Sequence, residues 1–323
     1  MTGLDLSIGM CFDRTFPAGA VTELARRLDE GGADELWVIE DCFYTAGVSL
    51  AAAALATTER LRVGLGILPA VARNPAVTAM EVATLCGIGP GRVIAGIGHG
   101  VQSWMAQMGA RPSSPVTTLE EVIVAVRRLL AGERVSVAGR AVRLDDVALE
   151  QPPSPPPPVL AGVRGPRSLA MAGRVADGVL LAEPATPACV TAAREQAGRG
   201  ADDGFHVAVF SALGIADNRD EAHRAMAPWL AGLLADPNPG LTALPWFDEL
   251  VDRFDAGGTD GLAAMPADRW TEIGPIGTFD DALAHLALLA GSGVRTVGLF
   301  PSAELDVARG QLDQVLALAR AVR

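Results

Sequence analysis

The sequence predicts an α/β fold, a (β/α)8 TIM barrel, and three observations support this. Eight short apolar segments alternate with eight amphipathic ones along 323 residues, a common length for such barrels. Half of the residues are hydrophobic, but they form short runs divided by Gly, Pro, Arg or Asp, so we expect a soluble protein without membrane partners. No G-x-G-x-x-G motif follows the first strand candidate, Leu4–Met10. An open doubly wound sheet is the alternative, because its strands and helices alternate in the same way.

Four strand–helix units fill about the first 130 residues. The first helix, Ala20–Glu30, carries apolar residues at helical spacing and stops at Gly31-Gly32. Thr117 and Thr118 each stand three residues before a glutamate, which predicts a capping box at the fourth helix. The other elements predicted here are strands Glu35–Ile39, Leu61–Ile67 and Arg92–Ile97 and helices Ser49–Thr58, Ala76–Ile88 and Leu119–Ala131.

A β-hairpin is predicted next, from Arg134–Val137 and Val142–Leu144, followed by a proline-rich stretch ending at Pro158. This stretch could link two domains, but we interpret it as a stiff surface connection within one domain, because the alternation then resumes. The remaining elements are strands Pro158–Val163, Gly178–Ala182, His206–Ile215 and Arg295–Phe300 and helices Arg167–Val175, Thr186–Gly198, Arg219–Leu234, Asp280–Leu289 and one from Leu305.

We therefore expect one barrel domain over residues 1–323. Its insertions are predicted at about 101–114, 132–157 and 236–277. The first and last of these follow strands 4 and 7.

The composition excludes several kinds of chemistry. All 26 basic residues are arginine, so a Schiff-base lysine, a lysine general base and the phosphate loop of NTPases are ruled out. The net charge of -12 argues against nucleic acid as a partner. The four cysteines and four histidines lack metal-ligand spacing, so we expect no metal site. The absence of a signal sequence favours a cytoplasmic protein with free thiols.

Candidate catalytic residues follow strands two and four, since a barrel builds its active site at the carboxyl ends of its strands. Glu40 and Asp41 follow apolar Trp37-Val38-Ile39, and His99 stands between Gly98 and Gly100. The ordinary pKa of histidine, near 6.5, suits His99 to proton donation or to a hydrogen bond with a cofactor. The alternatives are a helix cap or solvated side chain for the acids and an exposed loop position for the histidine.

The loop after the fifth strand is a candidate phosphate site. A glycine-rich turn leads into a helix with proline at its first position, which would present free backbone N–H groups beside two arginines. The alternative is that the glycines only turn the chain and the arginines are solvated. The residues of this candidate site are Gly162, Val163, Arg164, Gly165, Pro166, Arg167 and Ser168.

Five motifs in order along the chain together resemble the bacterial luciferase-like superfamily. The resemblance is stronger to its actinobacterial deazaflavin-dependent oxidoreductases, which are related to methylenetetrahydromethanopterin reductase. It covers about residues 5–300. The motifs are Glu40-Asp41, Gly66-Ile67-Leu68-Pro69 with Arg73-Asn74-Pro75, Pro90-Gly91-Arg92, Gly96-Ile97-Gly98-His99-Gly100 and Ala161-Gly162-Val163-Arg164-Gly165-Pro166.

The resemblance implies a cofactor, coenzyme F420 or alternatively FMN, with its ring in the barrel mouth and its phosphate near the fifth helix. It also implies a cis Gly66-Ile67 peptide against the ring, Asp41 near one end of the ring, and Gly98, His99 and Gly100 along the cleft. The implied activity is hydride transfer between reduced F420 and a small, hydrophobic substrate. An FMN-dependent monooxygenase and a non-catalytic flavin-binding barrel are the alternatives. We also expect a homodimer.

Two positions depart from the sugar-phosphate dehydrogenase branch of this family. Cys42 and Val101 stand where that branch has its histidine and glutamate. Its acid–base assignment is therefore not carried over. A phosphosugar substrate is disfavoured as well, because that branch uses lysine to bind it and this chain has none.

Overall fold

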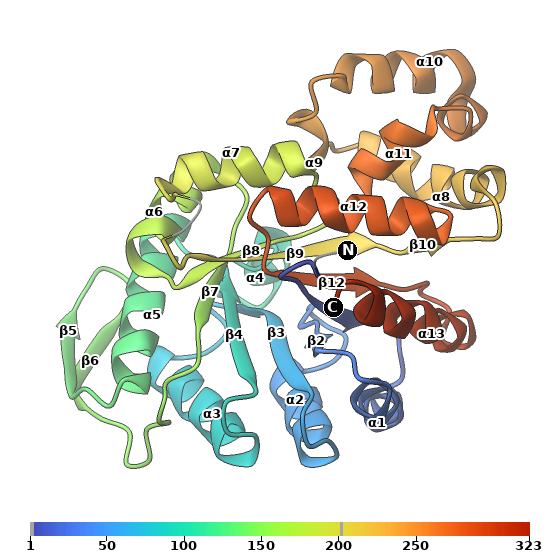
Figure 1. Ribbon diagram of the computed structural model, residues 1–323. Coiled ribbons are helices and arrows are strands. Elements are labelled where there is room, and N and C mark those ends of the chain that lie inside the picture. The colour runs from blue at the N-terminus through green and yellow to red at the C-terminus, as the bar shows by residue number, and fades with distance from the viewer. Residues whose placement is uncertain (1–2, 201–202) are drawn as a thin grey trace.

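The computed structural model describes residues 3–200 and 203–323, and it confirms the predicted barrel (Figure 1). Eight parallel strands close in the order β1-β12-β9-β8-β7-β4-β3-β2. Closure rules out the open sheet, which would leave two strands unpaired along one edge. The barrel strands are β1 (Ser7–Phe12), β2 (Glu35–Val38), β3 (Arg62–Pro69), β4 (Val93–Gly98), β7 (Val159–Gly162), β8 (Gly178–Leu181), β9 (His206–Ala212) and β12 (Thr296–Phe300).

Helices surround the barrel (Figure 1), and their apolar residues join its buried core. In α1 (Val21–Gly31), residues Val21, Leu24, Ala25 and Leu28 are buried, and the helix ends on Gly32 with φ 84°. The other helices on the barrel are α2 (Gly47–Ala56), α3 (Pro75–Ile88), α5 (Pro115–Leu130), α6 (Pro166–Val175), α7 (Pro187–Ala197), α12 (Phe279–Gly291) and α13 (Leu305–Ala321). A single turn of 3-10 helix, η1 (Ala18–Ala20), precedes α1.

The predicted capping boxes at Thr117 and Thr118 are wrong. Helix α5 begins at Pro115 with Ser114 as its N-cap residue, so both threonines lie inside the first turns. Proline fixes its own φ near the helical value and needs no hydrogen-bond acceptor for its nitrogen, so it is well suited to the first helical position. The proline signal therefore outweighs the threonine–glutamate spacing.

The predicted strand His206–Ile215 is divided. Strand β9 stops at Ala212, and β10 (Gly214–Ile215) pairs in parallel with β11 (Ile276–Gly277), a short strand that the sequence did not indicate. This pairing joins the chain before the predicted third insertion, 236–277, to the last two residues of that insertion. The chain between them forms α8 (Arg219–Leu234), α9 (Pro239–Thr242), α10 (Phe247–Ala263) and α11 (Ala267–Ile273).

Helices α8, α10 and α11 lie together beside the barrel (Figure 1). They share an apolar core of their own, which includes Leu230, Leu250 and Trp270, all with 0% exposure. On the opposite side of the view, β5 (Val135–Ala138) and β6 (Arg143–Val147) form the predicted antiparallel hairpin. Helix α4 (Gln102–Gln107) follows β4.

A buried carboxylate, that of Glu35, lies inside the barrel at the start of β2, together with its partners. Glu35 is fully buried, accepts a hydrogen bond of 2.7 Å from the Trp37 ring nitrogen, and pairs with Arg62 at 2.7 Å. Burial raises the pKa of Glu35, while Arg62 and Trp37 act in the opposite direction. Trp37 in turn packs edge-on against Phe210 at 5.4 Å between ring centres. Glu35 thereby fixes the Trp37 ring, which supports the Phe210 ring.

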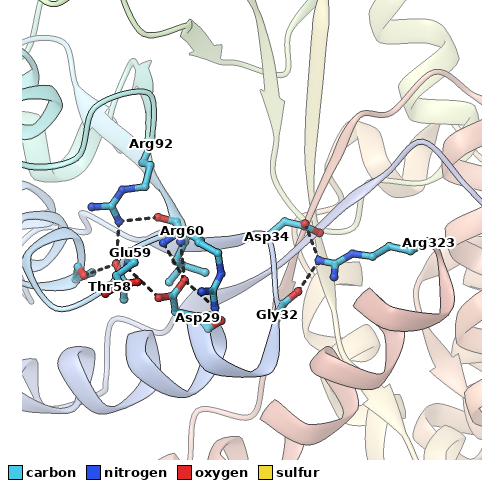
Figure 2. A network of polar contacts seen from close by, with 10 residues as sticks. Asp29, Gly32, Asp34, Thr58, Glu59, Arg60, Arg92 and Arg323 are labelled. Atoms are coloured by element: carbon cyan, nitrogen blue, oxygen red, sulfur yellow. Dashed lines mark hydrogen bonds and ion pairs between the residues drawn. The ribbon is translucent and has the colours of Figure 1, made fainter.

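The loops that lead into the strands are tied together by polar contacts (Figure 2). The Asp29 carboxylate accepts hydrogen bonds from the backbone N–H groups of Glu59, Arg60 and Leu61 at 2.9, 3.1 and 2.9 Å. Burial alone would raise its pKa, but the three N–H groups outweigh burial and the net shift is downward. Asp29 thus links the end of α1 to the chain that enters β3.

Among the residues that the structure describes, no helix combines the length and apolar character needed to cross a bilayer.

Candidate active site

A cavity of about 540 Å³ opens at the carboxyl ends of the barrel strands, and we name it the mouth cavity. It has the volume of a site for a medium-sized organic ligand. Its lining is mostly apolar and includes residues that follow β1, β2, β4, β7 and β8, together with residues at the end of β3 itself. The lining residues are Arg14, Ile39, Glu40, Asp41, Gly66, Ile67, Pro69, His99, Gly100, Val101, Trp104, Gly162, Val163, Arg164, Gly165, Leu180, Ala182, Glu183, Phe210 and Phe300.

The end of β3 bulges into the mouth cavity. The peptide bond Gly66-Ile67 is cis, as the resemblance implied, and the pairing of β3 with β4 shifts register between Leu65 and Leu68. Ile67 lies across two glycines of neighbouring strands. A Cβ atom on Gly162 would stand 2.5 Å from Ile67 Cγ2, and one on Gly98 would stand 2.6 Å from Ile67 Cδ1. These glycines are therefore required for the position of Ile67.

Asp41 lies in the mouth cavity as half of an ion pair. Its carboxylate accepts a hydrogen bond of 2.8 Å from Arg14, whose guanidinium also lies over the Tyr44 ring. The pair is partly exposed, with 42% of the Arg14 side chain and 29% of the Asp41 side chain accessible to solvent. Arg14 lies two residues beyond the end of β1 and was not among the predicted site residues, because these were taken from the ends of later strands.

Glu40 lines the mouth cavity, but its carboxylate is held by other groups. Arg73 donates two hydrogen bonds to it, at 2.5 and 2.8 Å, and the Gly47 N–H donates a third at 2.9 Å. These contacts join the β2–α2 loop to the start of α3, so Glu40 is placed as a structural anchor more than as a free acid. The neighbouring Cys42 thiol has a pKa raised by burial and by Glu40 and Asp41, which disfavours its thiolate.

His99 lies at the end of β4, with its ring nitrogen Nε2 hydrogen-bonded to the Ser168 hydroxyl at 2.9 Å. Within the described part of the chain, Nδ1 is buried and makes no direct hydrogen bond. Burial lowers the pKa of His99, and the Pro115 backbone partly offsets this. His99 is therefore more readily neutral than a solvated histidine, and it connects β4 to the first turn of α6.

The start of α6 lies at the rim of the mouth cavity. Gly165 is the N-cap residue and Pro166 stands at the first helical position, as predicted, so Ser168 lies within the first turn. Arg164 is exposed and lines the cavity, and in residues 3–200 and 203–323 no side-chain partner of its guanidinium is found within hydrogen-bonding distance. Arg167 is also exposed, but it does not line the cavity.

Glu183 is a site residue that sequence analysis missed. It stands two residues after the end of β8 and lines the mouth cavity. Burial raises its pKa; among the charges, Arg164 lowers it while Asp41 and Asp13 raise it. The rule that selected Asp41, an acid at the carboxyl end of a barrel strand, applies equally to Glu183 and would have found it.

The remaining histidines and thiols add no metal site. His206 contacts Thr296 at 3.0 Å at the opposite end of the barrel, and burial lowers its pKa to about 4. Across residues 3–200 and 203–323, no group of three or more His, Cys, Asp or Glu side chains is arranged to hold a metal ion.

Comparison with known proteins gives consistent matches. Residues 8–296 match the family described as luciferase-like monooxygenase. The 5,10-methylenetetrahydromethanopterin reductase of Methanolobus tindarius is 32% identical over 177 residues, which are 54% of each chain. The F420-dependent hydroxymycolic acid dehydrogenase of Mycobacterium tuberculosis is 31% identical over 244 residues, 74% of this chain and 61% of that protein. The matched regions thus span less than two thirds of either relative.

The fold also matches solved structures. The coenzyme F420-dependent tetrahydromethanopterin reductase from Methanopyrus kandleri superimposes with a TM-score of 0.77, over 98% of this chain and 97% of that one. The sequence identity is 19%, so this match shows a common fold.

Proposed function

Given that the chain belongs to the luciferase-like monooxygenase family, we propose that it is an F420-dependent oxidoreductase. It would transfer a hydride between the reduced coenzyme and a small, hydrophobic organic substrate. The observation that carries the proposal is Arg164, an arginine without a side-chain partner in the described chain, standing beside the start of α6 at the rim of a largely apolar cavity. The hydroxymycolic acid dehydrogenase and the reductase from Methanopyrus kandleri are both described as F420-dependent, which supports F420 as the cofactor.

The mouth cavity fits the ring of a deazaflavin. Its floor is the aromatic layer of Phe210 and Phe300, and Ile67 projects from one wall. A flat conjugated ring buries well against such surfaces. When bound, the deazaflavin would supply or accept the hydride, and the protein would orient it and exclude water.

The rim fits the anionic tail of the coenzyme. A phosphate is stabilised by the free N–H groups and the positive dipole end of a helix, and by arginine. A Cβ atom on Gly165 would meet nothing within 4 Å, so there is open space next to these N–H groups. We assign Arg164 and the backbone of 165–168 to the phosphate. Ser168 would act through its side chain by holding His99.

Three side chains would contact the deazaflavin ring. Asp41, its partner Arg14 and His99 all line the mouth cavity. His99, with its pKa lowered by burial and its ring held by Ser168, would line the ring site in its neutral form. Glu40 would position the loop that carries Asp41. The homodimer and the cytoplasmic location stay predictions.

The test is a titration of the purified protein with F420 and, separately, with FMN, followed by fluorescence. We expect F420 to bind more tightly, and tight binding of FMN without measurable affinity for F420 would contradict the proposal. Replacing Arg164 by alanine should weaken F420 binding about 10- to 100-fold, the effect of losing one or two charge-assisted hydrogen bonds. Arg167→Ala removes the same charge three residues away, outside the cavity lining, and is expected to change the affinity less than about threefold. Equal effects of the two changes would place the phosphate elsewhere.

A further inference from the structure

A second cavity of about 670 Å³ adjoins the mouth cavity, and we name it the side chamber. The two cavities share five lining residues: Arg14, Ile39, Asp41, Glu183 and Phe300. A molecule in the side chamber would therefore reach the ligand of the mouth cavity across this junction. The side chamber also lies at the carboxyl ends of the strands, where a barrel enzyme receives its substrate.

One wall of the side chamber is apolar. Helix α8 contributes Ala222, Ala225, Met226 and Trp229, and the chain after β9 contributes Leu213 and Ile215. Trp229 and Met226 are half-buried, so each already presents part of its surface to the chamber. This wall suits the apolar body of a substrate, and the thioether of methionine adapts to different shapes.

The charged groups of the side chamber are mostly acidic. Its lining includes four carboxylates, from Asp13, Asp41, Glu183 and Glu221, and one cation, Arg14. Arg14 is paired with Asp41 at 2.8 Å. Asp13 accepts hydrogen bonds from the Thr15 N–H at 2.8 Å and from its hydroxyl at 2.7 Å. Once these contacts are satisfied, the chamber still carries an excess of negative charge.

Glu183 is the carboxylate that lacks a partner at the junction. Within residues 3–200 and 203–323, no hydrogen bond or ion pair joins its carboxylate to another side chain, whereas Asp41 has Arg14. Burial raises its pKa, its own backbone N–H and Arg164 act in the opposite direction, and Asp41 and Asp13 add smaller upward effects. Glu183 is half-buried, and Arg164, a cation that acts on it, is assigned to the coenzyme phosphate. A second cation beside the carboxylate would therefore stabilise its charge.

We propose that the side chamber binds a substrate with an apolar body and a cationic nitrogen, an amine or an iminium, with Glu183 as the counterion. This inference rests on the proposed function and names the substrate class for the same site. A neutral substrate would leave Glu183 unpaired. An anionic substrate would meet Asp13 and Glu183 as like charges, so the chamber selects by charge as well as by shape.

The test compares three probes of similar size: 2-phenylethylamine, 2-phenylethanol and 3-phenylpropanoate. Each is titrated by calorimetry at pH 7.5 into the full chain saturated with oxidised F420, so that no turnover occurs. We expect the amine to bind at least about tenfold more tightly than the alcohol, and the propanoate to bind most weakly. This comparison uses the unaltered protein and does not depend on any variant folding.

Three variants test which residues cause the preference for the amine and where the probes bind. Glu183→Gln keeps the shape and removes the charge, and it should reduce the amine preference to about twofold or less. Glu195→Gln removes a charge from an exposed position on α7 that lines neither cavity, so it should leave the preference unchanged. Ala225→Trp fills the apolar wall and should weaken binding of all three probes, which places them in the side chamber.

The outcomes separate this inference from the proposed function. Failure of F420 to bind would overturn the proposed function, and the probes can then be titrated into the chain alone. If F420 binds and the alcohol or the propanoate binds as well as the amine, the proposed function stands and the cationic substrate is refuted. A preference for the amine that survives Glu183→Gln would also refute the role of Glu183.

Discussion

Replacing Gly66 by alanine tests how the floor of the mouth cavity is built. The added Cβ atom would stand 2.7 Å from Phe210 Cζ and 3.2 Å from Trp37 Cε3. Carbon atoms in van der Waals contact are about 3.5–4.0 Å apart, so Phe210 has to move by close to 1 Å. Its ring has little freedom to do so, because it packs edge-on against Trp37 and Phe300 at 5.4 Å each.

Overpacking of this kind costs about 1–3 kcal/mol in the free energy of unfolding. We expect Gly66→Ala to lower stability by that amount, measured by urea denaturation followed by circular dichroism. The displaced Phe210 ring would also enter the mouth cavity, so F420 affinity should fall by about tenfold or more.

The matched experiment is a double-mutant cycle with Phe210→Leu, which removes the atom that the new Cβ meets. Phe210→Leu alone should destabilise the protein by about 1–2 kcal/mol, because it removes buried ring atoms. Adding Gly66→Ala to it should cost far less than adding the same change to the natural sequence, giving a coupling energy of about 1 kcal/mol or more. Additive effects, or a Gly66→Ala protein as stable as the original, would refute the account of this floor.

Two further predictions concern stability. Asp29→Ala leaves the N–H groups of Glu59, Arg60 and Leu61 without their acceptor, and we expect a loss of about 2–4 kcal/mol in urea denaturation; a loss below about 0.5 kcal/mol would show that water replaces the carboxylate. Asp281 is bound by Arg219 at 2.8 Å and has its pKa lowered to about 2, first by that hydrogen bond and then by the backbone and hydroxyl of Thr278, with burial opposing. The ionised Asp281 contributes about 2 kcal/mol to the free energy of unfolding above about pH 4, and this contribution is lost as the pH falls toward 2. The difference in stability between the unaltered protein and Asp281→Asn should therefore shrink over that range. A difference that stays constant from pH 6 to pH 2.5 would contradict this.

Much of the site could be predicted from the sequence, because the carboxyl-end rule depends only on locating strands. Asp41, His99 and the loop 162–168 were found in this way, and all lie at or beside the mouth cavity. Arg14 was missed because the candidates were taken from the ends of later strands, although it lies two residues beyond the end of β1 at Phe12. Glu183 was missed although it lies two residues beyond the end of β8, because it belongs to none of the motifs that carry the resemblance.

The sequence by itself determined the order of strands and helices, and with it the barrel. Hydrophobic periodicity, glycine stops and proline starts act over a few residues, so they can be read along the chain. Only the tertiary structure decided which charged groups are paired. Asp41 meets Arg14 across 27 residues of sequence, Glu40 meets Arg73 across 33, and His99 meets Ser168 across 69. These contacts turn Glu40 into an anchor and leave Glu183 and Arg164 as charges facing the cavities. Such pairing depends on distances between residues far apart in the sequence, and the residue pattern within one strand or helix does not predict these distances.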